Sequence, residues 1–366
     1  MSDNELLYYL ALQKAEGVGA VNAKKLIVHC GNAKAVFKEK HAHLSKIDGI
    51  GNFVLKGLKS KTLFKAAEKE INFILKNNIS YHLITDDTYP DKLKHCSDAP
   101  VILFYDGTID LQNKKIISIV GTRNITGYGK EILEKLIADL VPFDPVIVSG
   151  LAYGVDIFAH KLAVKHNLQT VAVLAHGLDR IYPAVHKNTV AKILENGGLF
   201  TEFWSQTTPE RENFVKRNRI IAGLSEATIV IESANKGGSL ITAEIANSYN
   251  RDVFAVPGKL TDNFSKGCNN LIKTNRAALF NSVVDLRYLL NWEEETEAKT
   301  IQKKLFVQLK SEEKPIYNFL NENGKQQLDQ IALHCNTPIH KAVTILFNLE
   351  MSGLVQPLPG KIYKVV

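Results

Sequence analysis

The sequence predicts an α/β protein built on a Rossmann-like, doubly wound and mostly parallel sheet, with a helical N-terminal module and a C-terminal winged-helix module. The core prediction rests on apolar, β-branched runs that alternate with amphipathic helical segments. These runs are apolar on both faces, as is usual for parallel strands that helices cover on both sides. We expect modules at residues 1–76, 77–290 and 310–366, with a linker at 291–309.

The N-terminal module is expected to be helical, of a helix-hairpin-helix or SAM-like kind. Apolar residues from Leu6 to Leu12 begin a helical pattern, and Gly-x-Gly turns follow at Gly17–Gly19 and Gly49–Gly51. Such turns either bring backbone amides to a DNA phosphate or only cap helices in a packing unit, and the sequence favours neither. Residues 1–75 carry 12 Lys, no Arg and 7 acidic residues, which places +5 of the net +7 here.

The core module shows strands and helices in turn. Strands are expected at Ile116–Val120, Val146–Val148, Thr170–Leu174, Thr228–Ile231 and Val253–Val256, with another that ends near Glu202. Helices are expected between them, for example at Tyr128–Leu140 and Asp156–Lys165. Residues 77–115 extend the core with a preceding unit, in which Asp86–Pro90 and Asp106–Gly107 read as turns.

The last module follows a charged stretch without an apolar period, which begins at Asn291. Helices are predicted at Glu312–Asn323 and Gln327–Leu333, and a third begins with Thr337 as N-cap and Pro338 in the first turn. The buried side of the third helix is expected to hold Val343, Ile345, Leu346, Leu349 and Met351. Two strands, 353–355 and 361–366, complete a winged-helix pattern.

The third helix is the one that would read a DNA groove in a winged-helix protein. It offers only His340 and Lys341 as basic residues. A protein-docking or self-association role is therefore at least as well supported as duplex reading.

Composition excludes several classes of protein. The chain has 366 residues, 45% of them hydrophobic and 23% charged, so disorder of the bulk is excluded. Its four cysteines lie far apart without a CxxC pair, which argues against a zinc ribbon or a disulfide-framed module. No apolar run reaches the roughly 18–20 residues of a membrane span, and the start lacks a basic signal region. We expect a soluble cytoplasmic protein with a modest attraction for polyanions.

Glycine-rich turns follow several predicted strands. One reads Gly121-Thr122-Arg123, a second spans Ser149–Asp156, a third is His176-Gly177, and a fourth runs from Lys236 to Thr242. Ligands of doubly wound sheets bind at the carboxyl ends of the strands, where a glycine turn before a helix admits a phosphate. Asp156 is interpreted as a cap or dipole partner of the following helix.

Basic residues surround one aromatic between residues 211 and 224. Arg211, Lys216, Arg217 and Arg219 can meet phosphates, while Phe214 can stack on a base. The alternatives are a core position for Phe214 and an internal salt bridge for at least one arginine.

Motifs for other chemistry are missing. The sequence contains no GxGxxG fingerprint, Walker A loop or HExxH pair, and its 11 His are scattered. We expect no cofactor, no metal and no catalytic residue, and we interpret His160, His176 and His186 as structural.

Seven motifs, taken in order, are similar to the DNA processing protein A (DprA/Smf) family. They are GTR, SGLAYGVDIFAH, HGLDRIYP, FVKRNRIIAGLS, GGSLITAEIA, RDVFAVPG and KGCNNLI, within residues 80–280. The resemblance implies a non-catalytic protein that binds single-stranded DNA and loads the RecA recombinase during natural transformation, in competent cells that take up DNA. It also implies a homodimer formed through the Rossmann-like domain.

The resemblance also implies where the DNA lies, in a pocket of the Rossmann-like domain. Together with the residue analysis above, it gives these candidate single-strand-binding residues: Gly121, Thr122, Arg123, Gly150, Ala152, Gly177, Arg211, Phe214, Lys216, Arg217, Asn218, Arg219, Lys236, Gly238, Ser239 and Thr242. Two departures stand out. Thr122 replaces the usual Ser with the hydroxyl kept, and Asn275-Arg276 replaces a frequent Gly-Ala, which adds charge and puts the local backbone in question.

The alternative is a nucleotide-handling enzyme. The lysine-decarboxylase-like phosphoribohydrolases resemble this core and carry a GGxGTxxE loop. Here the loop reads GGSLITAE, so Leu240-Ile241 stands in place of Gly-Thr. Because these larger side chains would crowd a sugar-phosphate site, the sequence favours the DNA-binding interpretation.

Overall fold

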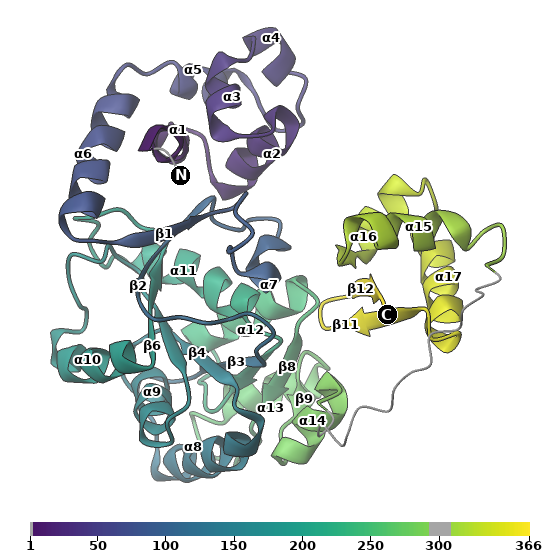
Figure 1. Cartoon of the computed structure of the whole chain (residues 1–366). Helices are drawn as coiled ribbons and strands as arrows, with labels where there is room; N and C mark the ends of the chain where they lie inside the picture. Colours follow the sequence, from purple (N-terminus) through teal and green to yellow (C-terminus); the bar gives the residue numbers. More distant parts are fainter. Residues whose placement is uncertain (1–2, 293–308) are drawn as a thin grey trace.

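The computed structural model describes residues 3–292 and 309–366 and confirms a mixed α/β architecture with a large, mostly parallel sheet (Figure 1). The nine strands of this sheet lie in the order β1-β2-β6-β5-β4-β3-β7-β8-β9. The pairs from β6 to β9 are parallel, whereas β1–β2 and β2–β6 are antiparallel. The strands are β1 (Ser80–Leu83), β2 (Ile102–Gly107), β3 (Ile116–Val120), β4 (Val146–Ser149), β5 (Thr170–Val173), β6 (Gly197–Thr201), β7 (Ala227–Val230), β8 (Asp252–Ala255) and β9 (Ala278–Leu279).

Helices connect these strands and cover the sheet. They are α7 (Asp91–Lys94), α8 (Gly127–Leu140), α9 (Val155–Lys165), α10 (Lys187–Glu195), α11 (Arg211–Leu224), α12 (Gly238–Ser248), α13 (Lys266–Lys273) and α14 (Val283–Leu290), with 3₁₀ turns at Val141–Phe143 and Ala184–His186. Every residue of β3 to β7 is buried, as two-sided burial of parallel strands requires. The apolar runs read from the sequence match these strands to within a residue or two.

The sheet reverses its winding direction between β3 and β7. From β3 the chain steps through β4, β5 and β6 on one side, then returns to place β7 on the other side of β3. Such a switch point leaves a crevice at the carboxyl ends of the two strands, where open α/β sheets bind ligands.

The helical N-terminal region packs over the β1–β2 end of the sheet (Figure 1). Its helices are α1 (Asp3–Lys14), α2 (Ala20–Cys30), α3 (Ala33–Lys38), α4 (His41–Leu44), α5 (Asn52–Leu58) and α6 (Thr62–Lys76). Each of the two Gly-x-Gly turns packs against a side chain that lies just beyond the other turn. A Cβ on Gly17 would lie 2.6 Å from the Phe53 ring beyond the second turn, and one on Gly49 would lie 3.4 Å from Lys25 beyond the first. Both glycines have positive φ, so both turns need glycine for backbone reasons, and only at Gly17 does close packing add to them.

The C-terminal region is a winged helix, as predicted. It comprises α15 (Lys314–Asn323), β10 (Gln326–Gln327), α16 (Leu328–His334), α17 (Ile339–Met351), β11 (Val355–Leu358) and β12 (Ile362–Val365), and its sheet has the order β10-β12-β11. The predicted cap of α17 was wrong. Pro338 occupies the cap position, and the Thr337 hydroxyl donates instead to the carbonyl of Cys335. Val343 and Met351, expected inside, are exposed.

Most of the predicted linker, residues 293–308, lies outside the described residues. Its first part differs from the expectation. Trp292 is buried in the core, and its indole Nε1 donates to Glu226 at 2.8 Å. Within the described parts of the chain, no helix has the length and apolar character needed to cross a membrane.

His160 on α9 is held inside the core as a neutral group. Its Nδ1 lies 2.7 Å from the Thr170 hydroxyl, which itself donates to the carbonyl of Ile147, so Nδ1 carries the proton. Burial, with the nearby positive charge of Arg217, lowers the pKa of His160 to about 3.

This histidine should make the fold acid-sensitive. Between pH 6.5 and about 3, His160 binds a proton in the unfolded chain but not in the folded chain. The free energy of unfolding therefore falls as the pH falls. The contribution of His160 to the slope of unfolding free energy against pH reaches about 1.4 kcal/mol per pH unit. Urea unfolding across this window should show a shallower pH dependence for His160→Asn than for the parent chain. Equal slopes would contradict the assignment.

Candidate functional site

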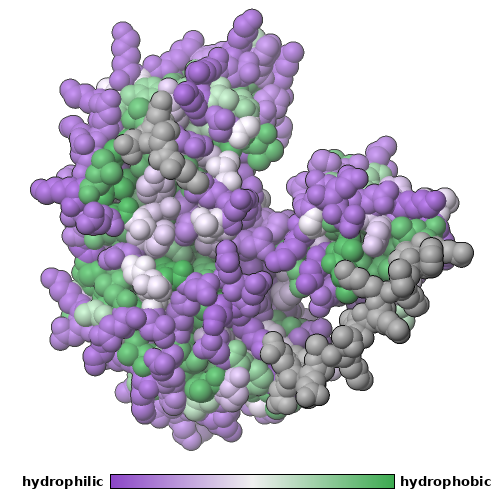
Figure 2. All heavy atoms as spheres, in the orientation of Figure 1, coloured by the Kyte–Doolittle hydropathy of each residue, from purple (hydrophilic) through white to green (hydrophobic). Residues whose placement is uncertain are grey.

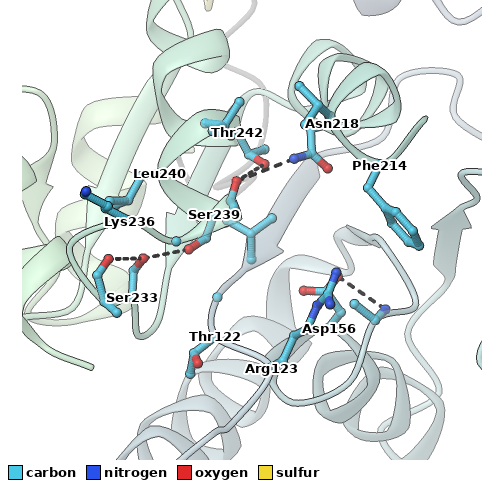
Figure 3. Close-up of a pocket in the computed structure, with 18 of the residues that line it drawn as sticks. Thr122, Arg123, Asp156, Phe214, Asn218, Ser233, Lys236, Ser239, Leu240 and Thr242 are labelled. Carbon is cyan, nitrogen blue, oxygen red and sulfur yellow. Dashed lines mark hydrogen bonds between the residues drawn. The ribbon is translucent and has the colours of Figure 1, made fainter. Parts of the chain in front are cut away.

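Two loops at the switch point form the walls of one pocket. Residues 121–123 follow β3, and residues 233–237 follow β7. With α11 and the loop before α9 they enclose about 780 Å³, which is within the roughly 300–1,000 Å³ of small-ligand sites. Figure 3 shows Phe214 and Asp156 on one side of this pocket, Ser233, Lys236 and Ser239 on the other, and Thr122 and Arg123 below.

The β3 loop is fixed by Glu232, at the end of β7. The Thr122 amide donates to the Glu232 carbonyl at 2.8 Å. The buried Glu232 carboxylate accepts from the amide of Thr126 at 2.9 Å and from its hydroxyl at 2.5 Å. The Thr126 hydroxyl also caps α8 by accepting from the amide of Gly129. Arg123 is therefore presented from a loop that both strands hold in place.

The β7 loop opens directly into α12. Gly237 is the cap and provides no side-chain bond, so backbone amides of the first turn remain available at the pocket wall. Ser239 and Thr242 were candidate single-strand-binding residues, but their hydroxyls bond to the protein. Ser239 donates to Ser233 at 2.9 Å, and Thr242 lies 3.5 Å from the Gly238 carbonyl. Both residues are buried and shape the wall.

Arg217 forms the floor of the pocket from the middle of α11. Its side chain is only 3% exposed, and one guanidinium nitrogen donates to the carbonyls of Gly150 and Val173. The buried Asp156 carboxylate faces it and accepts weakly from the Ala152 amide. Burial lowers the pKa of Arg217 to about 10, so it stays charged at neutral pH. Burial also raises the pKa of Asp156, and the charge of Arg217 opposes that rise.

Phe214 lies one turn earlier on α11 and is half-buried at the pocket, so it is not a core aromatic. The guanidinium carbon of Arg123 is 5.6 Å from its ring centroid, and that of Arg217 is 5.9 Å away. Tyr182 packs against it at 6.1 Å between centroids. Arg123 itself is exposed, and among the described residues its guanidinium has no hydrogen bond or ion pair. An aromatic face and a free cation thus stand together at the opening.

Most of the predicted site residues meet in this pocket. They are Gly121, Thr122, Arg123, Ala152, Arg211, Phe214, Arg217, Asn218, Lys236, Gly238, Ser239 and Thr242.

Four predicted residues do not line the pocket. Gly150 lies beneath it, where its missing side chain makes room for the guanidinium of Arg217. Gly177 packs against the carbonyl of Trp204, and Lys216 is exposed on another side of α11. Arg219 forms an internal ion pair with Glu202, the salt bridge expected of one arginine.

Several lining residues were missed by the sequence analysis. Among them are Asp156, Ser233, Asn235, Leu240, Ile241 and Glu244. Glu244 would repel an anion, but Arg276 pairs with its carboxylate at 3.0 Å. The neighbouring Asn275 adopts the left-handed conformation that a glycine would take, with φ of 55°. The unusual Asn275-Arg276 pair therefore keeps the local backbone and offsets an acid at the pocket.

Gly150→Ala tests whether Arg217 needs this space. A Cβ at Gly150 would lie 2.1 Å from the guanidinium nitrogen, so the side chain must leave its two carbonyl partners. We expect a loss of about 1–3 kcal/mol in unfolding free energy, measured by urea denaturation. Gly127→Ala is the control, because nothing lies within 4 Å of a Cβ there. Equal stability of the two variants would refute the role of Gly150.

Comparison with known proteins finds matches over most of the chain. A family described as DNA recombination-mediator protein A matches residues 80–291, and the DprA winged helix domain matches residues 307–361. Protein Smf of Synechocystis is 35% identical over 276 residues, covering 74% of this chain and 69% of that protein. DNA processing protein DprA of Streptococcus pneumoniae is 42% identical over 190 residues, covering 52% of this chain and 67% of that protein.

Two solved structures are similar as well. That of DprA from Streptococcus pneumoniae superposes with a TM-score of 0.64 at 32% identity, over 77% of this chain and 97% of that one. That of DNA processing protein A from Helicobacter pylori, described for its unique single-stranded DNA binding mode, gives a TM-score of 0.53 at 29% identity, over 59% of this chain and 97% of that one.

Proposed function

This chain belongs to the DNA recombination-mediator protein A family, DprA/Smf, and we propose that it binds single-stranded DNA in the pocket between β3 and β7. The observation that carries the proposal is the meeting of Arg123, Phe214 and Arg217 at the switch point of the sheet. We further propose that it protects the strand and loads RecA onto it during natural transformation, in the cytoplasm.

The pocket suits a phosphate and a base held side by side. Arg123, Arg211 and Lys236 are exposed cations on its rim, and the start of α12 adds backbone amides. Phe214 offers a face on which a base can stack, an interaction worth roughly 1–3 kcal/mol per base. Because these contacts read the backbone and the π-face, little sequence preference is expected. Duplex DNA is disfavoured because its bases are already stacked.

A binding role fits the pocket better than hydrolysis. Leu240 and Ile241 line the wall where the phosphoribohydrolase loop has Gly and Thr, and they narrow the space for a sugar phosphate. The Glu244 carboxylate, which such an enzyme would need, is paired with Arg276. The hydroxyls of Ser239 and Thr242 are directed into protein bonds. We therefore propose a non-catalytic recombination mediator.

The homodimer is proposed to form at the free edge of the sheet. β9 ends the sheet, and Leu279 on it is 48% exposed. The neighbouring α14 exposes Val284, Tyr288 and Leu289. An open strand edge beside exposed apolar side chains is a natural place for a second copy.

We propose the domain division 1–76, 77–290 and 310–366 as well, with the linker at 291–309. The family matches at residues 80–291 and 307–361 support two of these units, although Trp292 packs with the core.

Titration of labelled single strands at two salt concentrations tests the pocket. Arg123→Ala should weaken binding about tenfold and reduce the log–log salt slope by about 0.7, the loss of one phosphate contact. Phe214→Ala should weaken binding by a similar factor and leave the slope unchanged, because stacking releases no counterion.

Lys216→Ala is the matched control for this titration. It removes a cation from the exposed side of the same helix, outside the pocket, so affinity should change little. Duplex binding that equals single-strand binding and ignores Arg123→Ala would move the DNA site to another module.

RecA loading is tested separately. RecA should be retained by the immobilised chain, and RecA should nucleate faster on strands coated with single-strand-binding protein when the chain is added. The Arg123→Ala variant should still retain RecA, but it should lose most of the acceleration of RecA nucleation because it binds single-stranded DNA weakly. Absence of retention, with and without DNA, would remove the loading step and leave DNA binding standing.

A further inference from the structure

Helix α17 of the winged helix has three faces rather than two. One is buried in the domain and carries Ala342, Ile345, Leu346 and Leu349. A second is polar, with Lys341, Thr344 and Asn348. The third is apolar yet exposed, with Ile339 (54% exposed), Val343 (42%), Phe347 (57%) and Met351 (74%). These four side chains, the α17 stripe, are spaced four residues apart and so form one continuous row.

The α17 stripe is unsuited to DNA. In a winged helix that reads duplex DNA, this helix enters the major groove, where polar and basic side chains are needed. The wing tip and the turn before β10 both contact the core. Arg251 donates to the carbonyl of Pro359 at the wing tip at 3.1 Å, and Lys325 pairs with Asp91 of α7 at 3.2 Å. Figure 1 shows the β11–β12 wing directed at the core, and Figure 2 shows hydrophobic atoms on the surface of the C-terminal module.

We propose that the α17 stripe docks against the same stripe of a second copy of this chain, with the two helices antiparallel. The midpoint of the stripe lies at the level of Ile345 along the helix, so a two-fold axis through the stripe at that level places Ile339 opposite the second copy's Met351. The same axis places Val343 opposite the second copy's Phe347. Each contact is thus repeated in reverse on the other side of the axis, as an isologous interface requires.

Polar complementarity supports this register, because an imidazole N–H can donate to a carboxylate. His340 and Glu350 lie beside the stripe on its two ends, and both are exposed. The two-fold axis at Ile345 brings His340 opposite the second copy's Glu350, and the reverse pair follows by symmetry. A parallel arrangement would instead place Glu350 beside Glu350 of the second copy, where the two carboxylates repel each other.

The contact gives the chain a second self-association surface, distinct from the proposed one at β9 and α14. Two different isologous surfaces on one chain link copies into an extended row rather than a closed pair. Such a row would place successive pockets along one DNA strand. This consequence rests on the proposed function, whereas the α17 contact itself does not.

Light scattering on the full chain tests the contact. At equal concentration, Phe347→Glu should reduce the extended row to a dimer held by the proposed β9–α14 surface, because it buries a carboxylate against the second copy's Val343. Asn348→Glu adds the same charge on the polar face of the same helix and should leave the mass unchanged. Unchanged mass for Phe347→Glu would overturn the inference. If Phe347→Glu left the mass unchanged and also abolished duplex binding, the stripe would be a DNA-binding surface.

The two proposed surfaces can be separated by repeating the measurement in a Tyr288→Glu background. There the α17 contact alone should give a dimer, and adding Phe347→Glu should give a monomer. If the core interface is misplaced, Tyr288→Glu has no effect while Phe347→Glu halves the mass. Binding of a short single strand reports the pocket independently, and it should be unchanged by Phe347→Glu.

Mixing variants tests the register. Phe347→Glu and Val343→Lys should each weaken association alone. An equimolar mixture should restore it, because the antiparallel register pairs the new carboxylate with the new ammonium. Failure of the mixture to recover mass, with both variants folded by circular dichroism, would overturn the antiparallel pairing.

Discussion

The buried guanidinium of Arg217 is the interaction on which the site depends. A cation taken out of water must be met by fixed partners, and here the carbonyls of Gly150 and Val173 and the carboxylate of Asp156 supply them. These partners come from the ends of β4 and β5 and from α9, so a single side chain of α11 ties two strands and a helix together. Phe214, one turn away, is held at the pocket because Arg217 fixes the rotation of its helix.

The walls above this floor are held by polar bonds that strand ends provide. Glu232 links the end of β7 to the cap of α8, so the loops after β3 and β7 are placed by one carboxylate. Ser233 and Ser239 brace the second loop, and Gly267 packs beneath it, where a Cβ would lie 2.6 Å from the Ala234 carbonyl. Arg123 is left free within this rigid frame. Its guanidinium lies 5.6 Å from the Phe214 ring centroid and has no hydrogen bond or ion pair with the described residues, so it is placed to meet the proposed phosphate.

Sequence patterns predicted the strands and the pocket turns because both follow from local composition, namely apolar runs and glycine before a helix. These patterns could not show which of Arg217 and Arg219 faces the pocket and which forms an internal ion pair, because both are long cations on one helix. Only packing shows that the first faces the pocket and the second Glu202. Gly150 was predicted to leave space for a ligand, but the guanidinium of Arg217, 67 residues later in the sequence, fills that space. Val343 and Met351 were read as buried because periodicity marks apolar faces without saying what covers them.

The docking of the wing bears on both self-association and DNA binding. Arg251, which holds Pro359, immediately precedes β8 and so lies at the amino ends of the parallel strands. The pocket lies at their carboxyl ends. A winged helix fixed at the amino ends leaves the pocket entrance to DNA and keeps α17 turned away from the core. Copies joined through α17 would therefore add to a DNA-bound row without competing for the pocket. The proposed strand binding and the proposed α17 contact then lie at opposite ends of the parallel strands.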